Sequence, residues 1–180
     1  MANDLIEGCL RQDPKSQRGL YEKYRQSWFM TCLRYARNRM EADDIFQDGL
    51  MNVFKNLKQF DAKKAAFSTW SHRVMVNAAL QYLRKWNQID NLSLSESYVA
   101  EPIVEEDIND KMNAQELIKM IQKLPVGYRI VFNMYVLEGY KHKEIADILG
   151  ITVSTSKTQL FKAKKILQKE VEFLFQNDYE

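Results

Sequence analysis

The side chains of this chain that could contact a charged ligand gather in a basic stretch after Gly150. Ammonium groups, a hydroxyl and an aromatic ring recur there at helical spacing: Lys157, Thr158, Phe161, Lys162 and Lys165. Cations and hydrogen-bonding groups on one helix are the groups that contact phosphates and base edges in the major groove of DNA. The stretch therefore predicts a DNA-reading helix. An ordinary helical hairpin with a solvated lysine face is the alternative.

A helix-turn-helix over residues 140–165 is expected to present this basic face. Gly150 ends the first helix, because a left-handed backbone is least costly for glycine. Thr152 can cap the second helix with its side-chain oxygen. The inward sides of the two helices are apolar: Ile145, Ile148, Leu149, Leu160 and Ala163.

A second polar face is predicted on a helix over residues 41–57. Asp44, Gln47 and Asp48 share one side of it by helical spacing, opposite an apolar stripe that begins at Ile45. We expect this acidic side to be an interface rather than part of the core. Gly49, inside the same helix, costs about 1 kcal/mol relative to alanine, and a close approach of another helix is the only explanation that the sequence offers.

A third set of polar groups lies in a predicted loop and in the helix after it, which Ser68 is expected to cap. Lys63 and Lys64 mark the tip of the loop, and polar groups recur along the helix over residues 69–86: Arg73, Asn77, Gln81 and Arg84. Aromatic residues interleave with them, a combination typical of proteins that bind single-stranded nucleic acid. The alternative is that the tryptophans are core residues and the arginines are merely solvated. We expect the core role for Trp70 and the functional role for Arg73 and Asn77.

The composition favours an all-α protein of two small helical domains. Only 6 glycines and 3 prolines occur in 180 residues, and hydrophobic residues make up 46%, which is ample for packed cores. The net charge of +2 divides into +6 for residues 1–85, −7 for residues 86–110 and +3 for residues 111–180. This pattern predicts domains at 1–86 and 112–180, joined by an acidic linker at 87–111.

The sequence offers no candidate for catalysis or for metal binding. His72 and His142 lack ligand spacing, and we expect them to be surface or phosphate-facing groups. Cys9 and Cys32 are expected to be buried, reduced residues. There is no phosphate-cradling glycine loop, so we expect no cofactor and no enzyme activity. No apolar run reaches membrane-spanning length, and the N-terminus lacks the pattern of a signal peptide, so the expected location is the cytoplasm.

Three stretches in order resemble the bacterial RNA polymerase sigma factors of the extracytoplasmic-function type. EADDIFQDGLMNVFKNL (residues 41–57) resembles the family's polymerase-docking helix, and FSTWSHRVMVNAALQYLRK (67–85) resembles its minus-ten helix. Residues 124–167, from LPVGYRIVF to KAKKIL, resemble its minus-thirty-five domain. The resemblance covers about residues 20–85 and 112–169. It implies a sigma-2-like bundle and a sigma-4-like helix-turn-helix.

The resemblance also implies roles for the polar faces. Asp44, Gln47 and Asp48 would bind the clamp helices of the largest subunit of core RNA polymerase. The loop 61–67 would hold a flipped-out base, and the other minus-ten contacts would be Lys63, Lys64, Arg73, Asn77 and Arg84. The minus-thirty-five contacts would be Lys157, Thr158, Phe161, Lys162 and Lys165. The protein would direct core polymerase to promoters and melt the DNA, and an anti-sigma partner is implied by the family alone.

Two other functions remain compatible with the same motifs. A free-standing helix-turn-helix regulator would need added affinity, usually from dimerisation, and no dimerisation helix is evident. A sigma-like decoy that binds only an anti-sigma protein would not need the basic faces that Lys157, Lys162 and Arg73 provide.

Overall fold

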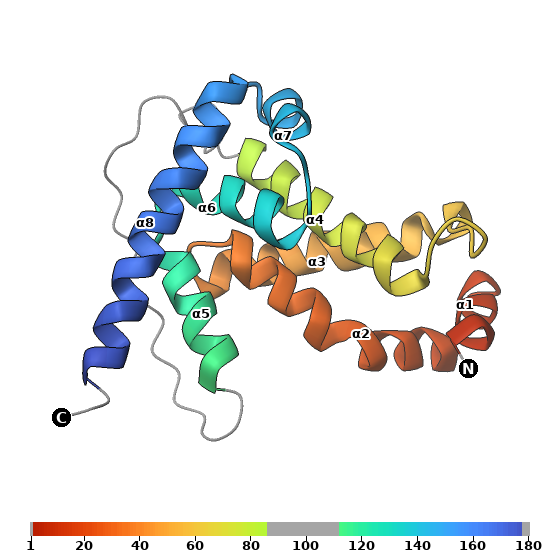
Figure 1. Ribbon diagram of the computed structural model, residues 1–180. Helices are drawn as coiled ribbons and strands as arrows, with labels where there is room; N and C mark the ends of the chain where they lie inside the picture. Colours follow the sequence, from red (N-terminus) through yellow and green to blue (C-terminus); the bar gives the residue numbers. More distant parts are fainter. Residues whose placement is uncertain (1, 86–111, 178–180) are drawn as a thin grey trace. The chain divides into compact units, whose positions relative to one another are not determined.

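The computed structural model describes residues 2–85 and 112–177, and all regular structure in these residues is helical (Figure 1). The chain divides into two compact units, Met1–Tyr82 and Leu83–Glu180. The predicted all-α class is confirmed. The predicted linker at 87–111 lies outside the described residues. None of the described helices is both long and apolar enough to cross a membrane.

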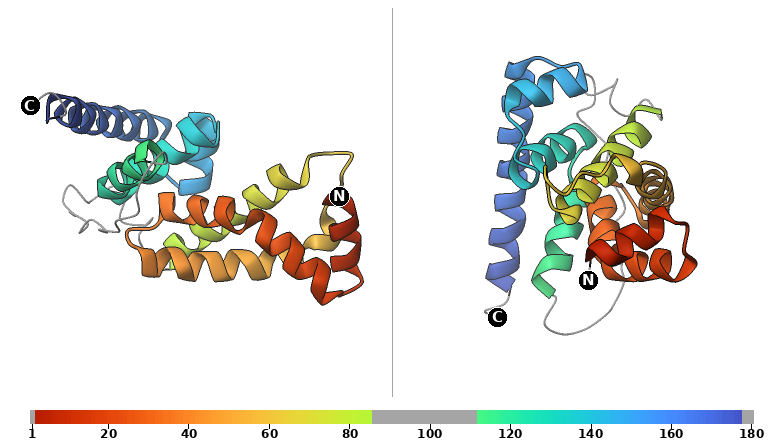
Figure 2. Two further views of the ribbon diagram at one scale, coloured as in Figure 1. Left: turned by 90° about the horizontal axis from the view of Figure 1, so that it is seen from below. Right: turned by 90° about the vertical axis from the view of Figure 1, so that its right-hand side faces the viewer.

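The first unit contains α1 (Ala2–Leu10), α2 (Pro14–Tyr35), α3 (Arg39–Lys55), a 3₁₀ turn (Leu57–Gln59) and most of α4 (Phe67–Lys85). The helices α1 and α2 pack on each other, and α2 packs on α3 (Figure 2). The helix α4 is joined to α2 by a buried hydrogen bond, 3.1 Å long, from Trp28 Nε1 to Ser71 Oγ. Fully buried side chains such as Leu20, Ile45 and Met75 form the core.

The start of this unit differs from the expectation drawn from the sequence. The apolar and aromatic spacing of residues 20–37 predicts one amphipathic helix, whereas the structure begins that helix, α2, at Pro14 and places α1 before it. A local signal marks this start, because Asp13 caps α2 by accepting a 2.9 Å hydrogen bond from Ser16 N and proline is favoured in a first helical turn. The prediction that Ser68 caps the next helix is wrong, because α4 already begins at Phe67.

Gly49 lies where α3 approaches α4. A methyl group added at Gly49 would overlap Met75 Sδ and would lie 3.4 Å from Met75 Cε and 3.5 Å from Ala78 Cβ. Met75 is fully buried and Ala78 is nearly so. The close helix approach expected at Gly49 is therefore confirmed, and the absence of a side chain is what permits it.

The second unit contains α5 (Met112–Lys123), α6 (Val126–Phe132), a π-helical turn (Asn133–Leu137), α7 (His142–Leu149) and α8 (Val153–Asn177). Both α6 and α7 pack on α8. One core cluster consists of Met120, Leu124, Ala163 and Leu167, with Tyr128, Phe132 and Ile166 packed against it. The predicted DNA-reading helix and the predicted helical tail after it form one continuous helix, since no glycine or proline interrupts α8.

Candidate functional sites on the two units

The predicted acidic face of α3 is exposed. Asp44, Gln47 and Asp48 all face solvent, whereas Ile45 and Val53 are fully buried on the other side of the helix. Two further exposed side chains extend the face: Met51 and Lys55. The exposure of Asp44, Gln47 and Asp48 agrees with the sequence analysis, and their role stays a prediction.

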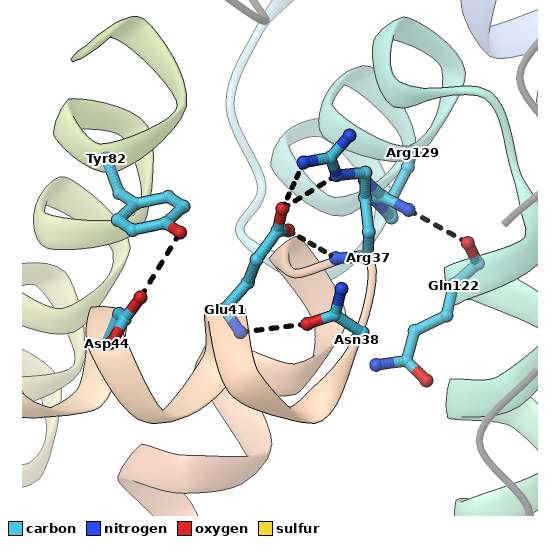
Figure 3. Close-up of polar contacts among 7 residues, drawn as sticks. All are labelled: Arg37, Asn38, Glu41, Asp44, Tyr82, Gln122 and Arg129. Atoms are coloured by element: carbon cyan, nitrogen blue, oxygen red, sulfur yellow. Dashed lines mark hydrogen bonds and ion pairs between the residues drawn. The ribbon is translucent and has the colours of Figure 1, made fainter. Parts of the chain in front are cut away.

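The helix α3 carries this face, and a polar network fixes its first turn (Figure 3). Asn38 Oδ1 accepts a 2.9 Å hydrogen bond from Glu41 N and so caps the helix. Glu41, only 5% exposed, accepts a 2.9 Å hydrogen bond from Arg37 N and forms an ion pair with the Arg37 guanidinium. Capping and pairing of this kind hold the helix start in one orientation.

Tyr82 of α4 is a contact of the acidic face that the sequence did not reveal. Its hydroxyl donates a long, 3.4 Å hydrogen bond to Asp44 Oδ2 (Figure 3). Burial raises the pKa of Tyr82, and the negative charges of Glu41 and Asp44 raise it further. The phenol therefore stays protonated and can act as a donor to Asp44. No sequence signal could have paired two residues that are 38 positions apart.

The polar groups of α4 and of the preceding loop are all exposed: Lys63, Lys64, Arg73, Asn77 and Arg84. Asp61 shapes the loop, because its carboxylate accepts a 2.9 Å hydrogen bond from Lys63 N and its carbonyl accepts a 3.0 Å bond from Lys64 N. The loop thus holds both lysines outward at its tip.

Aromatic rings gather at the two ends of this loop. The Phe60 ring centroid lies 5.4 Å from that of Phe67 and 5.6 Å from that of Trp70, and Phe67 and Trp70 are 5.7 Å apart. Phe67 is buried, whereas Trp70 is half-buried, so Trp70 serves the core only in part. An unstacked base near the loop would find partly exposed aromatic surface there.

The helix-turn-helix has the predicted corner. Gly150 adopts φ 67° and ψ 29°, the left-handed conformation, at the end of α7. Thr152 Oγ1 accepts a 3.0 Å hydrogen bond from Thr155 N and caps α8. Both capping predictions are confirmed.

The predicted reading residues lie on the outer side of α8: Lys157, Thr158, Phe161, Lys162 and Lys165 are all exposed. Phe161 is 68% exposed, which is unusual for a phenyl ring that packing could have buried. Leu160 and Ala163 are buried, as expected. Gln159 is also buried, although its polar side chain would suit the outer face, because it lies on the same side as these two residues.

Both histidines are half-buried and lie within hydrogen-bond distance of hydroxyl groups, so neither is a fully exposed surface group. The phosphate-facing role expected for them stays a prediction. His72 Nδ1 lies 3.2 Å from Thr31 Oγ1. His142 Nδ1 lies 2.9 Å from Ser156 Oγ, and its ring stacks on Tyr135 at 4.4 Å between centroids. Burial lowers the pKa of His142, and Lys157 and Lys164 lower it further, so the ring is neutral near pH 7. This neutral histidine joins the first turns of α7 and α8.

The described residues contain no group of three or more His, Cys, Asp or Glu side chains that could hold a metal ion. Cys9 and Cys32 are free thiols and both are buried, as the sequence predicted. Burial raises the pKa of the Cys32 thiol to about 12.

A groove lies between α6 and the middle of α8. It has a volume of about 360 Å³ and is lined by Pro125, Tyr128, Lys162, Lys165, Ile166 and Lys169. The Lys162 ammonium lies 5.8 Å from the centre of the Tyr128 ring. Lysine and tyrosine at this distance form a cation–π contact, so Lys162 lies at the border between the groove and the outer face of α8.

Comparison with known proteins assigns a family to each unit. Residues 20–88 match the family described as sigma-70 region 2, and residues 114–167 match sigma-70, region 4. Over 182 residues the chain is 26% identical to the ECF RNA polymerase sigma factor SigW of Bacillus subtilis, with 95% of this chain and 97% of that protein covered. It is 23% identical over 182 residues to the ECF RNA polymerase sigma-E factor of Haemophilus influenzae, with 93% of this chain and 94% of that protein covered.

A solved structure with the same fold is the sigma factor RpoE in complex with the anti-sigma factor NepR from Bartonella quintana. The TM-score is 0.55 at 16% sequence identity, and the match covers 86% of this chain and 96% of that chain. At this level of identity the likeness supports the fold of the chain.

Proposed function

The chain belongs to the extracytoplasmic-function sigma factors of the sigma-70 family, which are transcription initiation factors, and we propose that it binds core RNA polymerase and directs it to promoters through three separate exposed faces. The observation that carries this proposal is the order of the faces along the chain. An acidic face on α3, a basic and aromatic face on α4 and a basic face on α8 fall within the matched family regions.

We assign polymerase docking to Asp44, Gln47 and Asp48. Their exposure leaves the carboxylates available to a basic partner, and the network of Arg37, Asn38 and Glu41 keeps the helix that carries them in place. Electrostatic complementarity of this kind accelerates association and fixes register. The predicted partner is the pair of clamp helices of the largest polymerase subunit.

We assign recognition and melting of the minus-ten element to the loop and α4. Lys63, Lys64, Arg73 and Arg84 would contact phosphates, and Asn77 would contact a base edge of the melted strand. Unstacking a base costs a few kcal/mol. The aromatic surface of Trp70 beside the loop would offset part of that cost.

We assign the minus-thirty-five element to α8. Lys157, Thr158, Phe161 and Lys162 would reach base edges in the major groove, and Lys165 would contact a phosphate. The exposed Phe161 ring suits a thymine methyl group. The corresponding domain boundaries are 1–86 for docking and melting and 112–180 for upstream recognition, with 87–111 as the connection.

The docking assignment is tested by charge reversal. Asp44→Lys combined with Asp48→Lys should weaken binding to core polymerase by at least tenfold, because both charges face the partner. The melting temperature should change little, since both side chains are exposed and the hydrogen bond from Tyr82 to Asp44 is long. The matched control is Glu7→Lys, an exposed acid of α1. A large drop in melting temperature with normal polymerase affinity would reverse the assignment.

A further inference from the structure

The groove between α6 and α8 has a composition that the reading face alone does not explain. Its lysines, Lys162, Lys165 and Lys169, repeat at three and four residues along α8, so they lie on one side of the helix. The floor of the groove is Tyr128 and Ile166, both packed against the core cluster. The groove is thus a row of ammonium groups over a fixed apolar floor.

Lys165 and Lys169 carry positive charge that no carboxylate pairs with among the described residues. Like charges four residues apart on a helix repel each other, and these two lysines are so placed. Glu170, the acid next to Lys169 on α8, is instead paired with Lys123 of α5 at 3.1 Å. An anion in the groove would relieve the repulsion between the two lysines.

The groove is continuous with the proposed reading face. Thr158, Lys162, Lys165 and Lys169 follow one another at four, three and four residues, which is a single stripe along α8. Lys162, over Tyr128, belongs to both surfaces. When the outer face of a helix enters the major groove of DNA, the sides of that helix lie next to the phosphate backbones. On α8, the side that faces α6 carries the α6–α8 groove.

We propose that the α6–α8 groove is a binding site for the DNA backbone, in which Lys165 and Lys169 hold consecutive phosphates of one strand beside the minus-thirty-five element. This inference rests on the proposed upstream recognition. It adds Lys169 as a second phosphate contact, and it places both phosphate contacts on the side of α8 that faces α6. Tyr128 and Ile166 line the groove beside these lysines, and Lys162 lies between the proposed backbone contacts and the proposed base contacts. The groove positions the reading helix and carries no sequence information of its own.

The test uses the full chain assembled with core polymerase and a duplex promoter fragment, with affinity measured at several salt concentrations. Each phosphate contact contributes about 0.9 to the slope of log K against log salt. Lys165→Ala and Lys169→Ala should therefore each lower that slope by about 0.9. Over a fourfold rise in salt, each variant should lose about 3.5-fold less affinity than the unaltered protein. Both should weaken native and permuted upstream sequences equally.

A neutral phosphate analogue locates the contact. Methylphosphonates placed one at a time along the upstream strands should weaken the unaltered holoenzyme at one or two adjacent positions. The same positions should have no added effect on Lys169→Ala. Lys119→Ala, which removes a lysine of α5 outside the groove, should keep the salt slope and the methylphosphonate pattern of the unaltered protein.

Phe161→Ala separates this inference from the proposed function. If Phe161→Ala relaxes upstream specificity while Lys165→Ala and Lys169→Ala keep the original salt slope, the backbone site is refuted and upstream recognition stands. If Phe161→Ala also changes nothing, the reading face itself is misassigned. If Lys169→Ala weakens core polymerase binding at an unchanged DNA salt slope, the groove binds an acidic protein segment and the proposal is overturned.

Discussion

The close contact at Gly49 gives a quantitative test of how the acidic face of α3 is held on α4. Replacing Gly49 with alanine adds a methyl group that overlaps Met75 Sδ, and Met75 is fully buried. Overpacking of this kind costs about 1–3 kcal/mol, whereas alanine gains about 1 kcal/mol over glycine in helix propensity. The cost of overpacking against Met75 should exceed the gain in helix propensity, so we expect a net loss of about 1 kcal/mol in the free energy of unfolding.

A double-mutant cycle with Met75 isolates the repulsion from the propensity. Met75→Ala alone should cost about 2–5 kcal/mol by leaving a cavity. In the double variant the added methyl group has room, so the overpacking cost disappears and the combined loss should be smaller than the sum of the single losses by about 2 kcal/mol. Gln47→Ala, an exposed change on the same helix, should be nearly neutral.

Urea unfolding followed by tryptophan fluorescence is a suitable assay. Trp28 and Trp70, two of the three tryptophans of the chain, lie in the first unit, so their fluorescence reports on its unfolding. If Gly49→Ala stabilised the protein by about 1 kcal/mol and the cycle were additive, propensity alone would govern the position. The close approach of α3 to α4 would then be refuted.

Asn77→Ala should slow open-complex formation on duplex promoters and leave core polymerase binding unchanged, and wild-type opening rates on duplex DNA would remove Asn77 from the melting face. Thr152→Ala should destabilise the second unit by about 1 kcal/mol through loss of the hydrogen bond from Thr155 N, measured by far-ultraviolet circular dichroism, while Thr155→Ala, which keeps the backbone donor, should cost less. Cys32 should resist alkylation at pH 8 until urea exposes it, and rapid labelling of native Cys32 would contradict its burial. Because burial raises the folded-state pKa of the Cys32 thiol from 9.0 to about 12, its contribution to the free energy of unfolding is complete below pH 9 and falls as the pH rises toward 12.

Local signals in the sequence predict what local geometry decides. Gly150 and Thr152 specify the helix-turn-helix corner within three residues, and the spacing of Asp44 and Asp48 specifies a shared helix face. The start of α2 is equally local, since Asp13 caps it, but the apolar pattern that marks the rest of the helix is weak there.

Long-range packing decides the features that the sequence did not reveal. The donor to Asp44 is Tyr82, which belongs to another helix. Ser156 is buried because it meets His142 of the preceding helix. The α6–α8 groove depends on Tyr128 lying beneath Lys162. Periodicity assigns such residues to a face of their own helix but does not say what that face meets.

Transcription by core polymerase with and without this chain tests the central claim most directly. Fragmented genomic DNA of the source organism serves as template, and the 5′ ends of the transcripts are sequenced. We predict discrete start sites that appear only when the chain is present and that share two upstream sequence elements. Asp44→Lys with Asp48→Lys should abolish these start sites. If the chain bound core polymerase or DNA and yet produced no new start sites, it would not be acting as an initiation factor, and the proposed function would be wrong.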